Sequence, residues 1–139
     1  MKKLTVAIAF VLSACATTAP PPPAPPADRP SEATEPSPFR SLTWDETAAA
    51  VQAGAVLIDA RRTEGFDKGH IPGALSIPWN DEAALARLPA DKAARLVFYC
   101  GGPRCDASTK VGKKAQALGY TDIGEYSGGY PEWATLQVK

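Results

Sequence analysis

Proline is concentrated in one stretch of the chain, and this stretch limits how much of the sequence can fold. Nine of the 14 prolines lie between Pro20 and Pro38, a span of 19 residues. Proline lacks a backbone N–H and biases the residue before it to extended angles, so this span favours a polyproline-like tether over helix or sheet. The remaining 101 residues, 39–139, are enough for one compact core. We therefore expect a single folded domain over residues 39–139.

The residues before the prolines have the pattern of a targeting signal. Lys2 and Lys3 precede a mostly apolar stretch over residues 4–12. This stretch has the length of a secretory signal and is too short to span a bilayer, which takes about 20 residues. Residues 12–15 read Leu-Ser-Ala-Cys, which resembles the lipobox of bacterial lipoproteins. A plain signal peptide with a chance cysteine at its cleavage site is the alternative interpretation.

The lipobox resemblance implies a membrane anchor. Residues 1–14 would be removed as a signal peptide, Cys15 would be linked to diacylglycerol, and residues 15–38 would form a lipidated, proline-rich tether. The residue after the cysteine is Ala16, whereas an aspartate there would resemble an inner-membrane retention signal. We therefore expect a protein of the bacterial cell envelope, on the periplasmic side, with the outer membrane favoured over the inner membrane.

The charge balance excludes one class of partner. The chain has 15 Lys+Arg and 15 Asp+Glu, for a formal net charge of zero. Nucleic-acid binding requires a strongly basic face, so we expect no nucleic-acid partner.

The pattern within residues 39–139 alternates between helices and strands. Thr43 and Glu46 form a capping-box pattern at the start of the first helix, and Gly54 and Gly119 follow predicted helix ends. The predicted helices cover residues 44–52, 81–87 and 107–118, and the predicted strands cover residues 55–58, 74–77, 96–99 and 123–126. Continuous apolar runs separated by helices predict a parallel α/β sheet. Functional sites in such sheets form at the carboxyl ends of strands, and Cys100 lies at one.

The loop after Cys100 has features of a nucleophile site. A cysteine at the end of a strand and before a helix faces backbone N–H groups that favour a thiolate, which is the nucleophilic form. Gly101 and Gly102 allow the loop to curl with its amides pointing inward, and Arg104 adds a positive charge. Asp106 opposes the thiolate by its charge, although it is also a candidate helix N-cap.

Four motifs in the right order resemble a single-domain rhodanese, a sulfurtransferase. These are Leu57-Ile58-Asp59-Ala60-Arg61, the segment from Glu64 to Pro78 that contains Gly69-His70-Ile71-Pro72-Gly73-Ala74, the strand Val97-Phe98-Tyr99-Cys100, and Ser127-Gly128-Gly129-Tyr130-Pro131-Glu132-Trp133. The resemblance covers residues 41–133, which is nearly the whole predicted domain. It implies a three-layer α/β fold with a mostly parallel central sheet and helices on both faces.

The resemblance also implies a mechanism. Cys100 attacks a sulfane-sulfur donor such as thiosulfate, forms a persulfide and passes the sulfur to a thiol or cyanide acceptor. The persulfide is held by the substrate-binding loop, which consists of Gly101, Gly102, Pro103, Arg104 and Cys105. No metal or other cofactor is implied, and we expect a monomeric domain. His70 is expected to hold a turn, and Asp59 and Arg61 to be structural links.

The loop departs from the family pattern at its end. Many members have an Arg-Ser pair where this chain has Cys105-Asp106, and Arg104 comes one position early. The sequence leaves open whether Cys105 forms a disulfide with Cys100 as a redox partner or points into the core. Two alternatives to a sulfurtransferase therefore remain: a thiol–disulfide or sulfane-sulfur sensing module that uses Cys100 and Cys105, and a non-catalytic interaction module.

Overall fold

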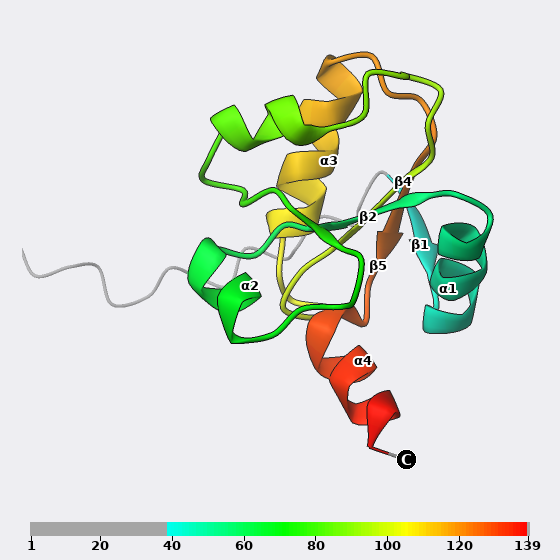
Figure 1. Ribbon diagram of the computed structural model, residues 1–139, viewed down its shortest axis with the longest axis vertical. Coiled ribbons are helices and arrows are strands. Elements are labelled where there is room, and N and C mark those ends of the chain that lie inside the picture. The colour runs from blue at the N-terminus through cyan, green and yellow to red at the C-terminus, as the bar shows by residue number, and fades with distance from the viewer. Residues whose placement is uncertain (1–38, 139) are drawn as a thin grey trace, which may run out of the picture. The chain divides into compact units, whose positions relative to one another are not determined.

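Five parallel strands form the central sheet of the computed structural model, which describes residues 39–138 (Figure 1). The strands are β1 (Arg40–Leu42), β2 (Val56–Asp59), β3 (Leu75–Ser76), β4 (Leu96–Tyr99) and β5 (Ile123–Tyr126). Their order across the sheet is β1-β5-β4-β2-β3, and every neighbouring pair is parallel. All five carboxyl ends therefore meet at one edge of the sheet. After β2 the chain continues to β3, on one lateral side, and after β4 it continues to β5, on the other. The carboxyl edge therefore has a topological switch point between β2 and β4.

Helices cover both faces of this sheet (Figure 1). The helices are α1 (Trp44–Gln52), α2 (Thr63–Lys68), α3 (Ala107–Ala117) and α4 (Gly129–Gln137), with a 3-10 helix over Ala83–Arg87. Alternate residues of β4 divide the core into two: Leu96 and Phe98 pack toward α3, whereas Val97 and Tyr99 pack toward α1 and α4. The three-layer α/β architecture predicted from the sequence is confirmed.

The capping pattern before α1 forms as predicted. The Thr43 hydroxyl accepts a hydrogen bond from the Glu46 amide at 3.3 Å, and the Glu46 carboxylate accepts one from the Thr43 amide at 2.9 Å. Gly54 follows the end of α1 with φ of +98°, a conformation that glycine adopts without steric cost. This helix therefore begins and ends at the predicted residues.

Three elements of the structure are additional to those predicted. Strand β1 was missed because only Leu42 of its three residues is buried, which leaves no apolar run to read. Helix α2 overlaps the motif from Glu64 to Pro78, in which a strand was predicted at residues 74–77 but no helix. Helix α4 contains Pro131, but the proline sits in its first turn, where its missing N–H is not needed.

The segment predicted as a helix over residues 81–87 is a 3-10 helix that begins at Ala83. Its hydrogen bonds are of the i to i+3 type, as in the bond from the Leu85 amide to the Glu82 carbonyl. Asp81 accepts bonds from the Ala83 and Ala84 amides, and this turn delays the start of the helix.

Within residues 39–138, no helix is long and apolar enough to cross a membrane. The predicted signal peptide, Cys15 and the proline-rich tether lie outside the described residues.

Candidate active site

Cys100 follows the last residue of β4, at the carboxyl edge of the sheet. Its side chain is buried, with 2% of the residue exposed. The loop that follows surrounds a pocket of about 380 Å³, and its lining contains all five residues predicted to bind substrate: Gly101, Gly102, Pro103, Arg104 and Cys105. Arg104 is exposed there and forms no ion pair with the residues that the structure describes. The fold thus brings together every predicted site residue except Cys15.

Oxygen atoms surround the Cys100 sulfur. Its Sγ donates toward the carbonyl oxygens of Cys105, at 3.1 Å, and Gly102, at 3.7 Å. The Ser108 hydroxyl lies 3.3 Å away on α3. The pKa of the Cys100 thiol is raised, first by its hydrogen bond to Cys105 and then by burial. Both causes favour the protonated form of the sulfur.

Cys105 has the opposite environment. Cys105 is half-buried and lines the pocket. It also packs against the core cluster under α3. A hydrogen bond from Cys100 lowers the pKa of the Cys105 thiol to about 6, with further support from the amides of Gly101 and Ala107. The expectation of a lowered pKa at Cys100 is thus corrected. Its hydrogen bond to Cys105 and its burial raise the pKa by more than the Ser108 hydroxyl and amide lower it.

The two sulfurs are not joined in this structure. Both Cys100 and Cys105 are free thiols.

A buried polar network behind Cys100 was missed by the sequence analysis. Ser108 of α3 donates a hydrogen bond of 2.5 Å to the carboxylate of Glu125 on β5, and the Thr109 hydroxyl also donates to it at 3.2 Å. Ser108 is 2% exposed and Glu125 is 8% exposed. Phe98 of β4 pairs with Glu125 in the sheet register, which places the carboxylate on the α3 face. A charged residue inside a predicted buried strand was the one signal in the sequence that pointed to it.

The amino end of α4 holds the start of the loop. The Tyr130 amide donates to the Cys100 carbonyl oxygen at 2.9 Å. Gly129 has φ of +64°, and a Cβ atom at this position would lie 2.5 Å from the Cys100 carbonyl oxygen and 2.7 Å from the Gly102 nitrogen. Only glycine therefore permits this close approach between α4 and the loop.

Asp59, Arg61 and His70 make structural contacts, as predicted. The buried Asp59 carboxylate accepts from the Arg61 guanidinium at 2.7 Å and from the Tyr99 hydroxyl at 2.8 Å. Burial is the main cause of a raised pKa at the Tyr99 hydroxyl. His70 stacks on Phe66 with ring centroids 3.7 Å apart, and its Nδ1 lies 3.1 Å from the Phe66 carbonyl oxygen.

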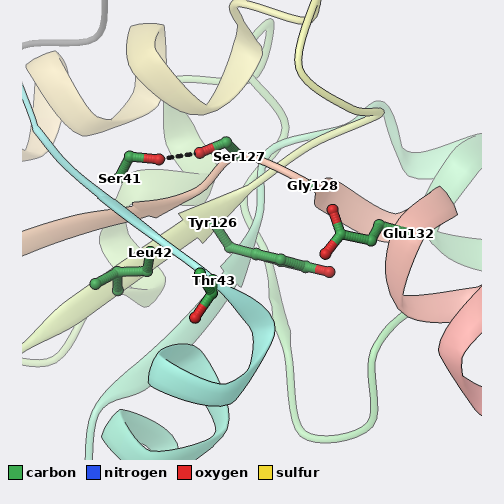
Figure 2. A pocket seen from close by; sticks show the side chains of 7 residues that line it. All are labelled: Ser41, Leu42, Thr43, Tyr126, Ser127, Gly128 and Glu132. Carbon is green, nitrogen blue, oxygen red and sulfur yellow. Dashed lines mark hydrogen bonds between the residues drawn. The ribbon is translucent and has the colours of Figure 1, made fainter.

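A second pocket, of about 220 Å³, lies beside the loop at the carboxyl ends of β1 and β5 (Figure 2). Its lining residues are Ser41, Leu42, Thr43, Tyr126, Ser127, Gly128 and Glu132. The Tyr126 hydroxyl points toward the Glu132 carboxylate, yet it makes no hydrogen bond with the described residues. Burial raises the pKa of Tyr126 to about 12, with a further contribution from Glu132.

Comparisons with known proteins identify the family. The rhodanese-like domain family matches residues 43–136. The mouse thiosulfate sulfurtransferase/rhodanese-like domain-containing protein 3 is 33% identical over 114 residues, which cover 71% of this chain and 71% of that protein. Human thiosulfate:glutathione sulfurtransferase is 39% identical over 93 residues, which cover 57% of this chain and 78% of that protein.

Solved structures give the same family. The human single-domain sulfurtransferase TSTD1 superposes with a TM-score of 0.55 at 32% identity, covering 68% of this chain and 95% of that one. The match to the family spans more than half of the chain and includes strands β2 to β5, among them the strand that Cys100 follows. This chain therefore belongs to the rhodanese-like family.

Proposed function

We propose that this protein is a sulfurtransferase that moves sulfane sulfur from a donor such as thiosulfate to a thiol or cyanide acceptor through a persulfide on Cys100. The observation that carries the proposal is the position of Cys100 at the switch point of the sheet, where its sulfur contacts the carbonyl oxygens of Gly102 and Cys105, two of the residues that line the loop pocket. Arg104, which is exposed at this pocket and unpaired among residues 39–138, supplies a positive charge for an anionic donor.

The proposed reaction has two steps. The Cys100 thiolate attacks the outer sulfur of thiosulfate, an S–S bond forms at Cys100, the S–S bond of thiosulfate breaks, and sulfite leaves with the electron pair of that bond. The acceptor thiolate then attacks the outer sulfur of the persulfide, and Cys100 leaves as a thiolate. The name of the human relative gives thiosulfate as a donor and glutathione as an acceptor, which makes this pair the first to assay.

A Cys100→Ser variant tests this proposal. We expect sulfur transfer from thiosulfate to glutathione to fall to the background rate, because an alcohol cannot hold the sulfane sulfur. In the unchanged protein, mass spectrometry of the Cys100 peptide after thiosulfate treatment is expected to show the addition of one sulfur atom. A Cys100→Ser variant with full activity would show that another group carries the sulfur.

A second candidate function is a thiol–disulfide or sulfane-sulfur sensing module. It is favoured by the position of Cys105 in the same loop, where its carbonyl oxygen lies 3.1 Å from the Cys100 Sγ. The Cys105 thiolate would attack the inner sulfur of a Cys100 persulfide, form a Cys100–Cys105 disulfide and release hydrosulfide, with no further oxidant. Mass spectrometry of the non-reduced protein decides between the two: a Cys100–Cys105 disulfide that survives mild reductant excludes persulfide turnover.

We also propose that the domain works at a membrane surface as a monomer. Residues 1–14 would be the signal peptide, Cys15 the lipidated residue and residues 15–38 the tether, which places the domain on the periplasmic side of the bacterial envelope. The support for this proposal is the lipobox-like Leu12-Ser13-Ala14-Cys15 and the proline-rich segment that follows it.

A further inference from the structure

The pocket at the carboxyl ends of β1 and β5 has no part in the proposed reaction. Its volume of about 220 Å³ is smaller than the roughly 300–1,000 Å³ of sites that enclose a drug-sized ligand, so it suits one end of a ligand. A few convergent polar groups are typical of such sites. Five of the lining side chains are polar: Ser41, Thr43, Tyr126, Ser127 and Glu132 (Figure 2).

Tyr126 brings an unused hydroxyl to this pocket. The residue is 1% exposed, and its hydroxyl makes no hydrogen bond with the residues that the structure describes. Buried polar atoms without a partner are rare in folded proteins, and each calls for an explanation. Burial and the nearby Glu132 raise the pKa of Tyr126 to about 12, so the hydroxyl is neutral at physiological pH. Its oxygen is then available to accept a hydrogen bond.

Glu132 gives the pocket a negative charge. Its carboxylate lies against Gly128, where a Cβ atom would clash with it, so the glycine leaves the space that the carboxylate occupies. Within residues 39–138, Glu132 forms no ion pair, whereas Arg40 and Glu46 at the same end of the sheet pair with each other at 2.9 Å. An unpaired carboxylate beside a hydroxyl oxygen attracts a cationic hydrogen-bond donor.

Helix stabilisation accounts for only part of this arrangement. Glu132 lies in the first turn of α4, where a carboxylate interacts favourably with the helix dipole. That interaction needs a negative charge near the helix end, and a carboxylate directed to solvent would provide it. It does not explain why the carboxylate lies against Gly128 and faces the Tyr126 hydroxyl (Figure 2).

The pocket is next to the Cys100 loop. Strands β5 and β4 are neighbours, and adjacent strands lie about 4.7–4.9 Å apart. Gly128 lines this pocket, and its carbonyl oxygen lies 4.0 Å from the position that a Cβ atom would take on Gly102, which lines the loop pocket. A ligand of tripeptide size is about 10 Å long when extended, so it is long enough to reach from one strand end to the next.

The two neighbouring pockets have opposite charges. Arg104 lines the loop pocket, and Glu132 lines the pocket at β1 and β5. An anionic sulfur donor such as thiosulfate is attracted by the arginine and repelled by the carboxylate. The pocket at β1 and β5 therefore suits the other substrate, the acceptor.

We propose that the pocket at β1 and β5 binds an ammonium group of the acceptor thiol, with Glu132 and Tyr126 as the hydrogen-bond acceptors. The ammonium group donates to the Glu132 carboxylate and to the Tyr126 hydroxyl oxygen, while the thiol reaches the Cys100 persulfide from the side of β5. The inference rests on the proposed function and names the acceptor class, a small peptide-like thiol with a free amino group. No covalent bond forms or breaks in this pocket.

Two acceptor thiols that differ by one amino group test this proposal. Glutathione has a free α-amino group, and glutaryl-cysteinyl-glycine is the same molecule without it. Sulfur transfer by the full-length protein is measured with each thiol at saturating thiosulfate. We expect kcat/KM to be about tenfold higher for glutathione, the size of effect expected from one hydrogen bond to a charged group. An equal or lower value for glutathione would overturn the proposal.

The Glu132→Gln variant removes the charge and keeps the shape of the side chain. We expect it to lower the ratio of the two kcat/KM values toward one by raising the KM for glutathione. The ratio cancels any change that slows both acceptors alike, such as a shift of α4. An unchanged ratio would overturn the proposal.

Glu64→Gln is the matched control. Glu64 is also an exposed carboxylate in the first turn of a helix, α2, but it does not line the pocket. We expect the ratio to stay at the value of the unchanged protein. A fall equal to that in Glu132→Gln would assign the effect to net charge and contradict the proposal.

Tyr126→Phe tests the second acceptor. It removes an oxygen that makes no hydrogen bond with the described residues, so the fold is expected to remain intact. We expect the ratio to fall about threefold, as for the loss of one hydrogen bond to a neutral group. A ratio equal to that of the unchanged protein would contradict the role of the hydroxyl.

A binding measurement separates this inference from the sulfurtransferase proposal. S-methylglutathione has the amino group but cannot accept sulfur, and its titration into the full-length protein is followed by the backbone amide NMR signals of Ser127 and Gly128. We expect both signals to shift, with binding at least several-fold weaker in Glu132→Gln. If these signals do not move, the pocket inference fails. If they move but thiosulfate leaves no persulfide on Cys100, the proposed function fails instead.

Discussion

Asp59 shows how a single buried charge ties three parts of the domain together. Its carboxylate at the end of β2 is fully buried, and it accepts from Arg61 in the next loop and from the Tyr99 hydroxyl on β4. The same hydroxyl accepts from the Ile71 amide at 3.1 Å. Arg61 also donates to the Gly69 carbonyl oxygen at 2.6 Å, so the network fixes the loop on both sides of α2.

Asp59→Ala is therefore expected to destabilise the fold strongly. Removing one partner leaves Arg61 and the Tyr99 hydroxyl without their acceptor, and breaking a buried pair costs about 3–5 kcal/mol. Urea unfolding measures the change in the free energy of unfolding. Asp122→Ala is the matched control, because the Arg95–Asp122 pair is exposed and such pairs contribute about 0–1 kcal/mol. Equal losses in the two variants would contradict the structural role given to Asp59.

At the scale of single residues, the sequence was most informative where the chemistry lies within one motif. Cys100 and its five loop residues are contiguous, so their place together at the carboxyl edge of the sheet could be predicted. Ser108 and Glu125 could not be paired from the sequence, because they meet only through the packing of α3 on β5. The raised pKa of Cys100 also depends on its burial and on the groups that face its sulfur, which no residue pattern specifies.

Helix α4 is the element that connects the end of the domain to its pocket. Its first residue, Gly129, lies against the Cys100 carbonyl and the Gly102 amide, and the Tyr130 amide bonds to Cys100. The aromatic rings of Tyr130 and Trp133, with centroids 5.7 Å apart, pack against the core cluster under α1. The loop geometry after β4 is thus maintained in part by a helix that follows β5.

Gly129→Ala is expected to reduce sulfur transfer more than it reduces stability. The added Cβ would force the Cys100–Gly102 backbone to shift, because it would lie 2.5 Å from the Cys100 carbonyl oxygen. Gly119→Ala is the control: Gly119 has a similar positive φ of +99°, but a Cβ there meets nothing within 4 Å. Both variants carry the left-handed strain of about 1–2 kcal/mol, so a thermal melt should shift for both.

Activity normalised to folded protein then isolates the loop contact. A loss in Gly129→Ala no larger than that in Gly119→Ala would mean that α4 does not position the loop.

The elements that were predicted are those with a strong local signal. A few consecutive residues are enough to recognise the apolar runs of β2 and β4 and the capping box of α1. Strand β1 depends instead on pairing with β5, since Arg40 and Ser41 are exposed. Helix α4 begins at Gly128-Gly129, a pair typical of turns, and is stabilised by packing that lies outside its own sequence.

At the scale of the whole molecule, the folded domain and the preceding residues 1–38 carry separate predictions. Because a lipidated cysteine would anchor the chain, Cys15→Ser is expected to move the protein from the membrane fraction to the soluble fraction of a bacterial host. Cys105→Ser is the matched control and is expected to stay with the membranes. If Cys15→Ser remains membrane-bound, the lipid-anchor proposal is wrong.

Because all the strands are parallel, the beginning of β1 and the Cys100 loop lie at opposite edges of the sheet. The described chain enters the domain just before Arg40, at the amino end of β1, whereas the Cys100 loop lies at the carboxyl edge of the same sheet. The four residues of β4 span about 13 Å, so the amino and carboxyl edges of the sheet lie about that far apart. The described chain therefore begins at one edge of the sheet, and the Cys100 loop lies at the other. A molecule that binds at this loop would contact the edge opposite Arg40.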